Sequence, residues 1–175
     1  MTVTADLRHV IYALSEALDL VGVDDVAHGK RVGLMAAECG RVLGLAEGEV
    51  GFLFDVGMLH DIGVSSTRIH HHLVAQFDWD GSQVHCQVGH ALLKGFAPFA
   101  GMALPVRYHH TRWDQLPHAG LDAPVLRTAN LIYLVDRVDA LAAPHYADNS
   151  LLNGVRLRWR SGGAWPRPIT PTTRC

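Results

Sequence analysis

Histidine is the residue type that offers chemistry in this chain, because 12 of its 175 residues are histidines and several stand beside one another or beside an aspartate. Seven histidines and aspartates fall on the sides of predicted helices that otherwise face the core: His28, His60, Asp61, His85, His109, His110 and Asp136. Burying one polar group without a partner costs about 1–3 kcal/mol, and an unpaired charge costs more. Seven such residues in one core therefore indicate that their side chains converge on a common ligand.

The residue types point to one class of ligand. Imidazole nitrogens and carboxylate oxygens together suit Fe, Mn, Co, Ni or Zn, whereas a site for Mg or Ca alone would favour oxygen ligands. Adjacent residues on a helix project about 100° apart. The pairs His60–Asp61 and His109–His110 can each straddle one point, with an aspartate bridging two ions. Because two ions about 3.5–4 Å apart hold the attacking and leaving oxygens in phosphoryl transfer, the pattern predicts a site for this chemistry.

Each of these residues also has a simpler interpretation on its own. A single inward histidine is more often a hydrogen-bonded core residue than a metal ligand, and a His-Asp dipeptide arises easily by chance. The seven residues together, on ordered helices, favour the metal site. Three further histidines, His70, His71 and His72, stand in a segment without periodicity and are interpreted as part of a solvated loop.

Apolar residues three and four positions apart define the helices that must position these side chains. The helices are predicted from Asp6 to a stop at Gly22, after the caps Asp24 and Asp25 to Gly44, from near Glu47 to Gly63, from the Ser82 cap to Gly95, over Phe99 to His110, and from the Asp122 cap through Asp136. Pro105 must kink or restart the fifth of them. The predicted inward face of the fourth helix is His85, Val88, Gly89 and Leu92.

No stretch alternates with a period of two for long enough to predict a strand. The fold class is therefore all-α, with the metal site in the core of a single helical bundle. Residues 64–80 are predicted to form a connecting loop. From Asn149 onward the periodicity is lost, and arginines and prolines follow without an acidic residue among the arginines. We expect residues 1–148 to form the domain, and the basic, proline-containing tail 149–175 to be poorly ordered.

Composition limits the functions that are open to the chain. A length of 175 residues, of which 49% are hydrophobic and 18% charged, suits one compact domain. The net charge of -2 provides no basic field for a nucleic-acid polymer or an anionic membrane. No apolar run approaches the roughly 20 residues that cross a bilayer, and no secretory signal is recognised, which predicts a cytoplasmic protein. Because Cys39, Cys86 and Cys175 form no C-x-x-C pair, we expect ordinary buried or surface thiols.

Five short motifs, in order along residues 5–145, resemble those of HD-GYP domains, a branch of the HD metal-dependent phosphohydrolase superfamily. The motifs are His28-Gly29-Lys30-Arg31-Val32, Leu59-His60-Asp61-Ile62-Gly63, His85-Cys86-Gln87-Val88-Gly89, His109-His110-Thr111-Arg112-Trp113-Asp114 and Val135-Asp136-Arg137-Val138-Asp139-Ala140-Leu141. The resemblance implies an all-helical HD-type fold and two or three divalent ions, with Fe or Mn expected. It also implies hydrolysis of the bacterial second messenger cyclic di-GMP by a metal-bridged hydroxide.

The resemblance assigns roles to individual residues. The metal ligands that it implies are His28, His60, Asp61, His85, His109, His110 and Asp136. Asp61 is expected to bridge two ions, and Asp61 and His60 are the expected catalytic residues. Asp24 matches a carboxylate that holds a third ion in some members, but it can equally cap a helix.

The chain departs from the family pattern around the substrate. Val64 replaces a lysine that holds a phosphate, Thr111 replaces a glutamate, and the loop that normally reads Asp-Gly-x-Gly-Tyr-Pro is Asp114-Gln115-Leu116-Pro117. Candidates to contact phosphate or to stack on guanine instead are Arg112, Arg107, Lys94, Trp113 and Trp79. A solvated surface role or simple packing is the alternative for each of them.

Three functions follow from these observations. The intact ligand pattern favours a metal-dependent phosphodiesterase that acts on a cyclic dinucleotide. The missing lysine and the altered loop favour hydrolysis of another phosphate ester or nucleotide. A third possibility is a degenerate HD module that binds a ligand or a signalling protein domain without catalysis.

Overall fold

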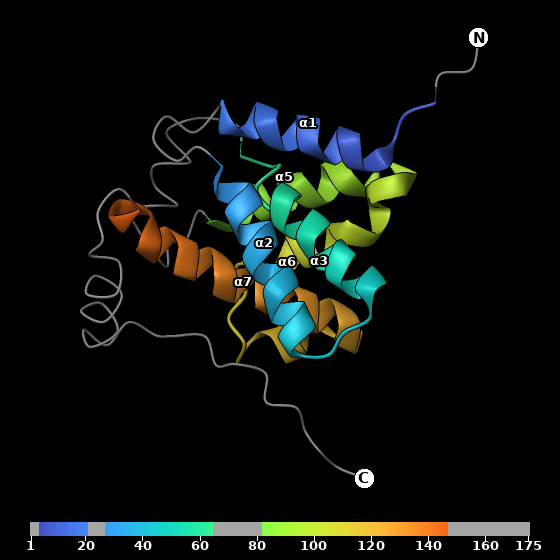
Figure 1. Cartoon of the computed structure of the whole chain (residues 1–175). Helices are drawn as coiled ribbons and strands as arrows, with labels where there is room; N and C mark the ends of the chain where they lie inside the picture. Colours follow the sequence, from blue (N-terminus) through green and yellow to red (C-terminus); the bar gives the residue numbers. More distant parts are fainter. Residues whose placement is uncertain (1–3, 21–26, 65–81, 147–175) are drawn as a thin grey trace.

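Every regular element in the described part of the chain is helical (Figure 1). The computed structural model of the chain describes residues 4–20, 27–64 and 82–146. Its α-helices are α1 (Leu7–Asp19), α2 (His28–Val42), α3 (Glu47–Leu59), α5 (Ser82–Lys94), α6 (Ala103–Tyr108) and α7 (Ala123–Ala142). Short 3-10 helices span Ala97–Met102, Leu116–Ala119 and Ala143–His145. The all-α prediction is confirmed, and none of the described helices is long and apolar enough to span a bilayer.

The first two helices start in different ways. The first helix begins after Asp6, whose side chain caps it by accepting a hydrogen bond of 2.9 Å from the backbone N–H of Arg8. The prediction that Asp24 or Asp25 caps the second helix is wrong. The N-cap of α2 is Ala27, which has a left-handed φ of 70° and makes no side-chain cap bond. This turn makes His28 the first residue of α2.

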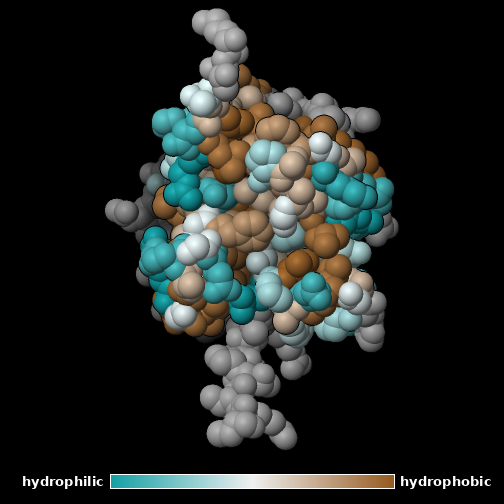
Figure 2. Space-filling view, turned by 90° about the vertical axis from the view of Figure 1, so that its right-hand side faces the viewer, coloured by the Kyte–Doolittle hydropathy of each residue, from teal (hydrophilic) through white to brown (hydrophobic). Residues whose placement is uncertain are grey.

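Helix α5 is rotated relative to its predicted face. Val88 and Leu92 are 41% and 54% exposed, whereas Cys86 and Leu93 are buried. The inward row therefore runs through residues 86, 89 and 93, with His85 beside it. His85 and Gly89 face inward as predicted, and a Cβ on Gly89 would lie 2.9 Å from Cγ1 of Val106 on α6. On the face in Figure 2, hydrophobic and hydrophilic residues are interspersed, as is usual for a protein surface.

Each of the last two α-helices has a proline in its first turn. The 3-10 helix 97–102 is followed directly by the short helix α6. Pro105 stands in the first turn of α6, where a backbone N–H has no acceptor within the helix, so that its absence costs no hydrogen bond. Helix α6 ends at Tyr108, so that His109 and His110 follow its last turn. Asp122 precedes α7 as predicted and Pro124 lies in its first turn, although the Asp122 side chain makes no cap bond.

The hydrophobic core lies where α2, α3, α6 and α7 meet. Helix α2 packs against both α3 and α7, and α5 packs against α6, while α1 lies across one end of the bundle (Figure 1). The most deeply buried core residues on these four helices are Val32, Ala36, Val56, Leu59, Val106 and Ile132. The site residues stand at the edge of this core.

Glycines bring the backbones of α2 and α3 into contact. A Cβ on Gly57 would lie 2.5 Å from the Cα of Gly33, and a Cβ on Gly29 would lie 2.9 Å from the carbonyl oxygen of Met58. The two helices therefore touch along their backbones over two turns. This contact holds His28, at the start of α2, beside His60, at the end of α3.

Gly63 provides a second close approach. A Cβ at this position would lie 2.0 Å from the carbonyl oxygen of His85 and 2.5 Å from the backbone nitrogen of Gly89. The turn after α3 therefore lies directly on the backbone of α5. As a result Asp61, in the same turn, faces the first turn of α5, where His85 stands.

We expect Gly57→Ala to lower the free energy of unfolding by about 1–3 kcal/mol, because the added methyl forces α2 and α3 apart. Gly48→Ala is the matched control on the same helix, since a Cβ there meets nothing within 4 Å. It should raise stability by up to about 1 kcal/mol through helix propensity. Urea denaturation of both variants measures the difference, and equal stabilities would contradict the backbone contact.

Candidate metal centre

All seven side chains singled out from the sequence lie in one cluster. His28 starts α2, His60 and Asp61 follow α3, His85 lies in the first turn of α5, His109 and His110 follow α6, and Asp136 lies on α7. The imidazole rings stand next to one another, with centroid distances of 5.1 Å for His28–His60 and 5.2 Å for both His60–His109 and His85–His109. Five helices therefore contribute to one small polar centre.

The carboxylate of Asp61 is the middle of this cluster. Its Oδ2 atom lies 3.4 Å from His60 Nε2 and 3.9 Å from His28 Nε2. Its Oδ1 atom faces the other way and lies 3.2 Å from His85 Nε2 and 3.7 Å from His109 Nε2. The two oxygens of one carboxylate are thus divided between two pairs of imidazoles.

Asp136 completes the group on the Oδ2 side of Asp61. Its Oδ1 atom lies 3.3 Å from His28 Nε2 and 3.8 Å from His60 Nε2. His28, His60 and Asp136 place one donor atom each within 4.8 Å of one another. This first donor group joins the ends of α2 and α3 to the middle of α7.

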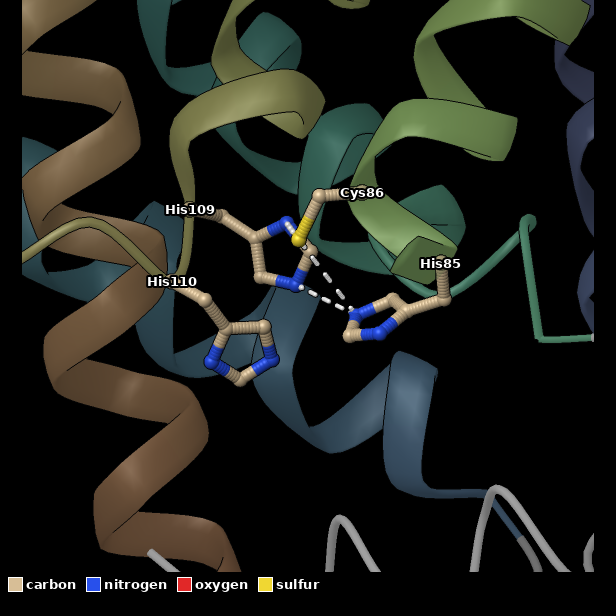
Figure 3. A group of neighbouring side chains, drawn as sticks. All are labelled: His85, Cys86, His109 and His110. Carbon is tan, nitrogen blue, oxygen red and sulfur yellow. Dashed lines mark hydrogen bonds between the residues drawn. The ribbon is translucent and has the colours of Figure 1, made fainter. Parts of the chain in front are cut away.

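Figure 3 shows a second donor group, His85, Cys86, His109 and His110. Its members His85 and His109 face the Oδ1 atom of Asp61. His85 Nε2 is 3.4 Å from His109 Nε2. The centroids of the His85 and His110 rings are 5.0 Å apart. His85, Cys86, His109 and His110 each offer a donor atom within 4.8 Å of the others. This group joins the start of α5 to the end of α6.

The donor atoms fit divalent transition-metal ions. Nitrogen and oxygen ligands bind such ions at about 2.0–2.2 Å, so two donors to one ion stand about 3.0–3.6 Å apart. The distances in both groups lie within a few tenths of an ångström of that range. Moreover, His60 Nε2 on one side of the Asp61 carboxylate and Asp61 Oδ1 on the other are buried without a hydrogen bond, which is costly unless each atom has a ligand beside it. The residues are therefore suited to hold two ions, one on each side of Asp61.

The histidines at the helix ends are oriented by the same local device. His60 Nδ1 donates a 2.7 Å hydrogen bond to the carbonyl of Gly57, and His109 Nδ1 donates a 2.7 Å bond to the carbonyl of Val106. Both acceptors are carbonyls of a last helical turn, which lack partners within the helix. With the proton on Nδ1, each ring presents the lone pair of Nε2 to the centre, as a metal-binding histidine requires.

Asp139 orients His28 in the same way and was given no role from the sequence. Its carboxylate is fully buried and accepts a 2.7 Å hydrogen bond from His28 Nδ1. Arg31 donates two bonds of 2.8 Å to the same carboxylate, and the Tyr146 hydroxyl donates another. The sequence did carry one indication of this role. Residues three apart on a helix share a face, and Asp139 follows Asp136 by three, so the spacing places Asp139 on the same face as a metal-ligand candidate.

Cys86 lies within the metal centre, which the spacing of the cysteines in the sequence did not indicate. Its Sγ atom is fully buried and stands 3.6 Å from His85 Nε2 and 3.7 Å from His109 Nδ1. Burial opposes the thiolate, but His109 and His85 lower the pKa of the thiol to about 6. The expectation of an ordinary buried thiol therefore understates this residue, which belongs to the second donor group.

The charges of the cluster are strongly coupled. Burial opposes ionisation of Asp61 and Asp136, yet the surrounding histidines hold the pKa of each carboxyl well below its usual range. Burial likewise opposes protonation of His85, but Asp61 raises its pKa to about 9. The pKa values of His28 and His109 are raised well above the ordinary value by the carboxylates and by Cys86. Burial lowers the pKa values of His60 and His110.

The candidate substrate-binding residues differ in their exposure, in their hydrogen-bond partners and in their distance from the metal centre. Arg112 is exposed and its Nε atom lies 3.3 Å from Asp114, and the Arg107 guanidinium donates to the side chain of Gln83 at 3.2 Å. Trp113 is half-buried. Lys94 stands nine residues beyond His85 at the far end of α5, about 13 Å along the helix axis. The structure therefore does not bring Lys94 to the metal centre.

Several residues singled out from the sequence lie outside the described residues. They are Asp24, the third-ion candidate, the loop histidines His70, His71 and His72, the stacking candidate Trp79, and the tail 149–175.

The fold and the site define a class of protein: an all-helical domain in which helix ends converge on a histidine–aspartate cluster suited to two divalent ions. Among curated proteins, the chain is similar to 3'3'-cGAMP-specific phosphodiesterase 1 of Vibrio cholerae serotype O1 (strain ATCC 39315 / El Tor Inaba N16961). The two are 40% identical over 136 residues, which is 78% of this chain and 32% of the relative. The chain thus spans about a third of the length of this relative. No family model matches the chain, and no solved structure matches it.

We expect Asp139→Asn to lower the affinity for Mn²⁺ about 10–100-fold, because partners that orient a metal-binding histidine contribute this much. Tyr146→Phe is the matched control, since it removes a different hydrogen bond to the same carboxylate and leaves His28 in place. Competition with a chelator measures both affinities. Equal effects of the two substitutions would mean that Asp139 does not act through His28.

Metal binding should release protons, and the affinity should increase with pH. The raised pKa values of His85, His28 and His109 mean that these rings hold protons at neutral pH in the metal-free protein, and an ion must displace them. The affinity should rise about tenfold per pH unit for each proton released, until the pH approaches the His85 pKa of about 9. Calorimetric titration in two buffers of different ionisation enthalpy counts the protons.

His9→Gln is the control for this measurement, since His9 is exposed on α1, outside the cluster. It should leave proton release unchanged. A metal affinity that does not vary between about pH 6 and about pH 8 would contradict the charge arrangement described above.

Proposed function

We propose that this chain is a metal-dependent phosphodiesterase domain of the HD type that hydrolyses a cyclic dinucleotide. The observation that carries the proposal is the position of Asp61, whose two oxygens face two separate groups of metal-binding side chains. The similarity to a phosphodiesterase that acts on a cyclic dinucleotide supports the same reaction class. The motif order along residues 28–141 supports it independently.

In this proposal Asp61 would be the ligand shared by two ions. His28, His60 and Asp136 would hold the first ion, and His85, His109 and His110 would hold the second, with Fe or Mn as the expected metals. Divalent ions held there would supply Lewis acidity, which activates water and stabilises the negative charge that develops on the phosphoryl oxygens. The chain's own residues position the donors, and the buried core behind them excludes water from the rest of the site.

The orientation of the donors is built in before any ligand arrives. Asp139 and the carbonyls of Gly57 and Val106 fix three imidazoles with their Nε2 atoms inward. Little reorganisation is therefore needed when a substrate binds, which is the condition under which electrostatic stabilisation is most effective.

Two cyclic dinucleotides are candidate substrates. The motif resemblance implies cyclic di-GMP, whereas the relative is specific for 3'3'-cGAMP. Another phosphate ester or nucleotide is the alternative substrate class, and Val64 favours it. This side chain is 8% exposed and apolar where the family pattern has a lysine, so it provides no cation to hold a phosphate of the usual substrate.

The test is turnover by protein loaded anaerobically with Fe²⁺ or Mn²⁺. We expect hydrolysis of 3'3'-cGAMP or cyclic di-GMP to a linear product, detected by chromatography. Asp61→Asn should lower the rate at least about 100-fold, because it removes several kcal/mol of transition-state stabilisation. Asp55→Asn is the matched control, since Asp55 lies on α3, contacts Arg8 and does not belong to either donor group. It should keep the wild-type rate.

The outcomes separate the three functions. Turnover of a cyclic dinucleotide that is lost in Asp61→Asn supports the proposal. Turnover of other phosphate esters alone supports the alternative substrate class. Metal-loaded protein that binds a cyclic dinucleotide and forms no product would show a binding module and would overturn the proposed activity.

A further inference from the structure

The Nδ1 atom of His110 has the opposite hydrogen-bond role to that of His28, His60 and His109, where Nδ1 donates. Arg137, one residue after Asp136 on α7, places its Nη2 atom 2.9 Å from His110 Nδ1. An arginine guanidinium has hydrogen-bond donors and no acceptor. Nδ1 of His110 must therefore accept this bond, which leaves the proton of the neutral ring on Nε2.

We propose that His110 is a hydrogen-bond donor to an anionic ligand in this chain and not a metal ligand, with Arg137 as the residue that positions it. The inference rests on the metal centre proposed above and changes its composition: the second ion would be held without His110. The ligand class that fits a donor N–H beside two cations is a phosphate ester oxygen.

The contrast with the neighbouring residue carries this argument. His109 Nδ1 donates to the carbonyl of Val106, so its Nε2 lone pair is available to an ion. His110 Nδ1 accepts from Arg137, so its Nε2 carries a proton and has no lone pair to offer. Two adjacent histidines that appear equivalent in the sequence thus differ in the role of Nδ1, which donates a hydrogen bond in His109 and accepts one in His110.

The direction of the ring agrees with this role. In Figure 3 one ring nitrogen of His110 faces α7 and the other faces the side of His85. Since Arg137 is on α7 and bonds to Nδ1, the nitrogen on the side of His85 is Nε2. Its N–H therefore points toward the second donor group, where a phosphate oxygen of a bound substrate would lie.

Packing keeps the pair in place. Arg137 is only 5% exposed, and its guanidinium carbon lies 5.3 Å from the centroid of the Tyr133 ring. The Tyr133 ring in turn stands 6.5 Å from that of His110, edge to face. On the other side, Gln83 donates a 3.3 Å hydrogen bond to the carbonyl of His110. The arginine and the histidine backbone are both fixed, so the ring has little freedom to present Nδ1 or a bare Nε2 to an ion.

The proton position can be measured directly by NMR. The whole chain, labelled with ¹⁵N in its histidines, is compared in its metal-free form and loaded with Zn²⁺, which is diamagnetic. The His110 signals are assigned with His110→Gln. We expect His110 to keep a protonated Nε2 in both states, while His109 keeps a protonated Nδ1. A His110 Nε2 that is unprotonated and shifted by Zn²⁺ would overturn the proposal.

Metal content gives a second readout that does not depend on activity. His110→Ala should retain the wild-type number of Mn²⁺ ions per chain after dialysis, whereas the adjacent control His109→Ala should lose an ion. Equal loss of metal in the two variants would overturn the proposal. Arg137→Val removes the donor, and the His110 signals should then report a protonated Nδ1; an unchanged Nε2 proton would show that Arg137 does not position the ring.

These results are separable from those that test the proposed activity. A protein that hydrolyses a cyclic dinucleotide but binds Zn²⁺ through His110 would keep its proposed function and lose this inference. A protein without turnover whose His110 retains the Nε2 proton in the Zn²⁺-loaded state would do the reverse.

Discussion

The structure depends on the cost of burying one carboxylate. Asp61 is largely removed from solvent, and an isolated charge in such a place is very unfavourable. It is tolerated because four imidazoles from different helices surround it. The requirement explains why helices far apart in the sequence must end or begin at one point, and why the apolar core stops short of that point. Metal ions would replace the protons that balance this charge in the metal-free protein.

Helix ends do most of the positioning. The last turn of a helix leaves carbonyls without partners, and in α3 and α6 one of these carbonyls accepts the Nδ1 proton of the histidine three residues later. A histidine placed just after a helix is thereby aimed and given a defined tautomer without any additional residue. His28 starts its helix, has no such carbonyl behind it, and depends instead on the buried carboxylate of Asp139.

Periodicity predicted the helices and their inward residues well, because apolar spacing reports burial directly. It was half right for α5, where His85 and Gly89 face inward as predicted but Cys86 and Leu93 are buried in place of Val88 and Leu92. It also failed at the start of α2, because the left-handed turn at Ala27 has no signature in residue type. The partners Asp139 and Arg137 could not be predicted from their spacing alone, since their roles depend on hydrogen bonds across more than a hundred residues for Asp139 and 27 for Arg137.

The backbone contact between Gly33 and Gly57 has a consequence for sequence variation. Where two helices touch through their main chains, the span between them is determined by peptide geometry and is insensitive to the size of the side chains around it. Exposed residues of α2 and α3 can therefore change without altering the gap from His28 to His60. Homologous domains should vary on the exposed faces of these helices and yet keep the same distance between the two imidazoles that bind an ion.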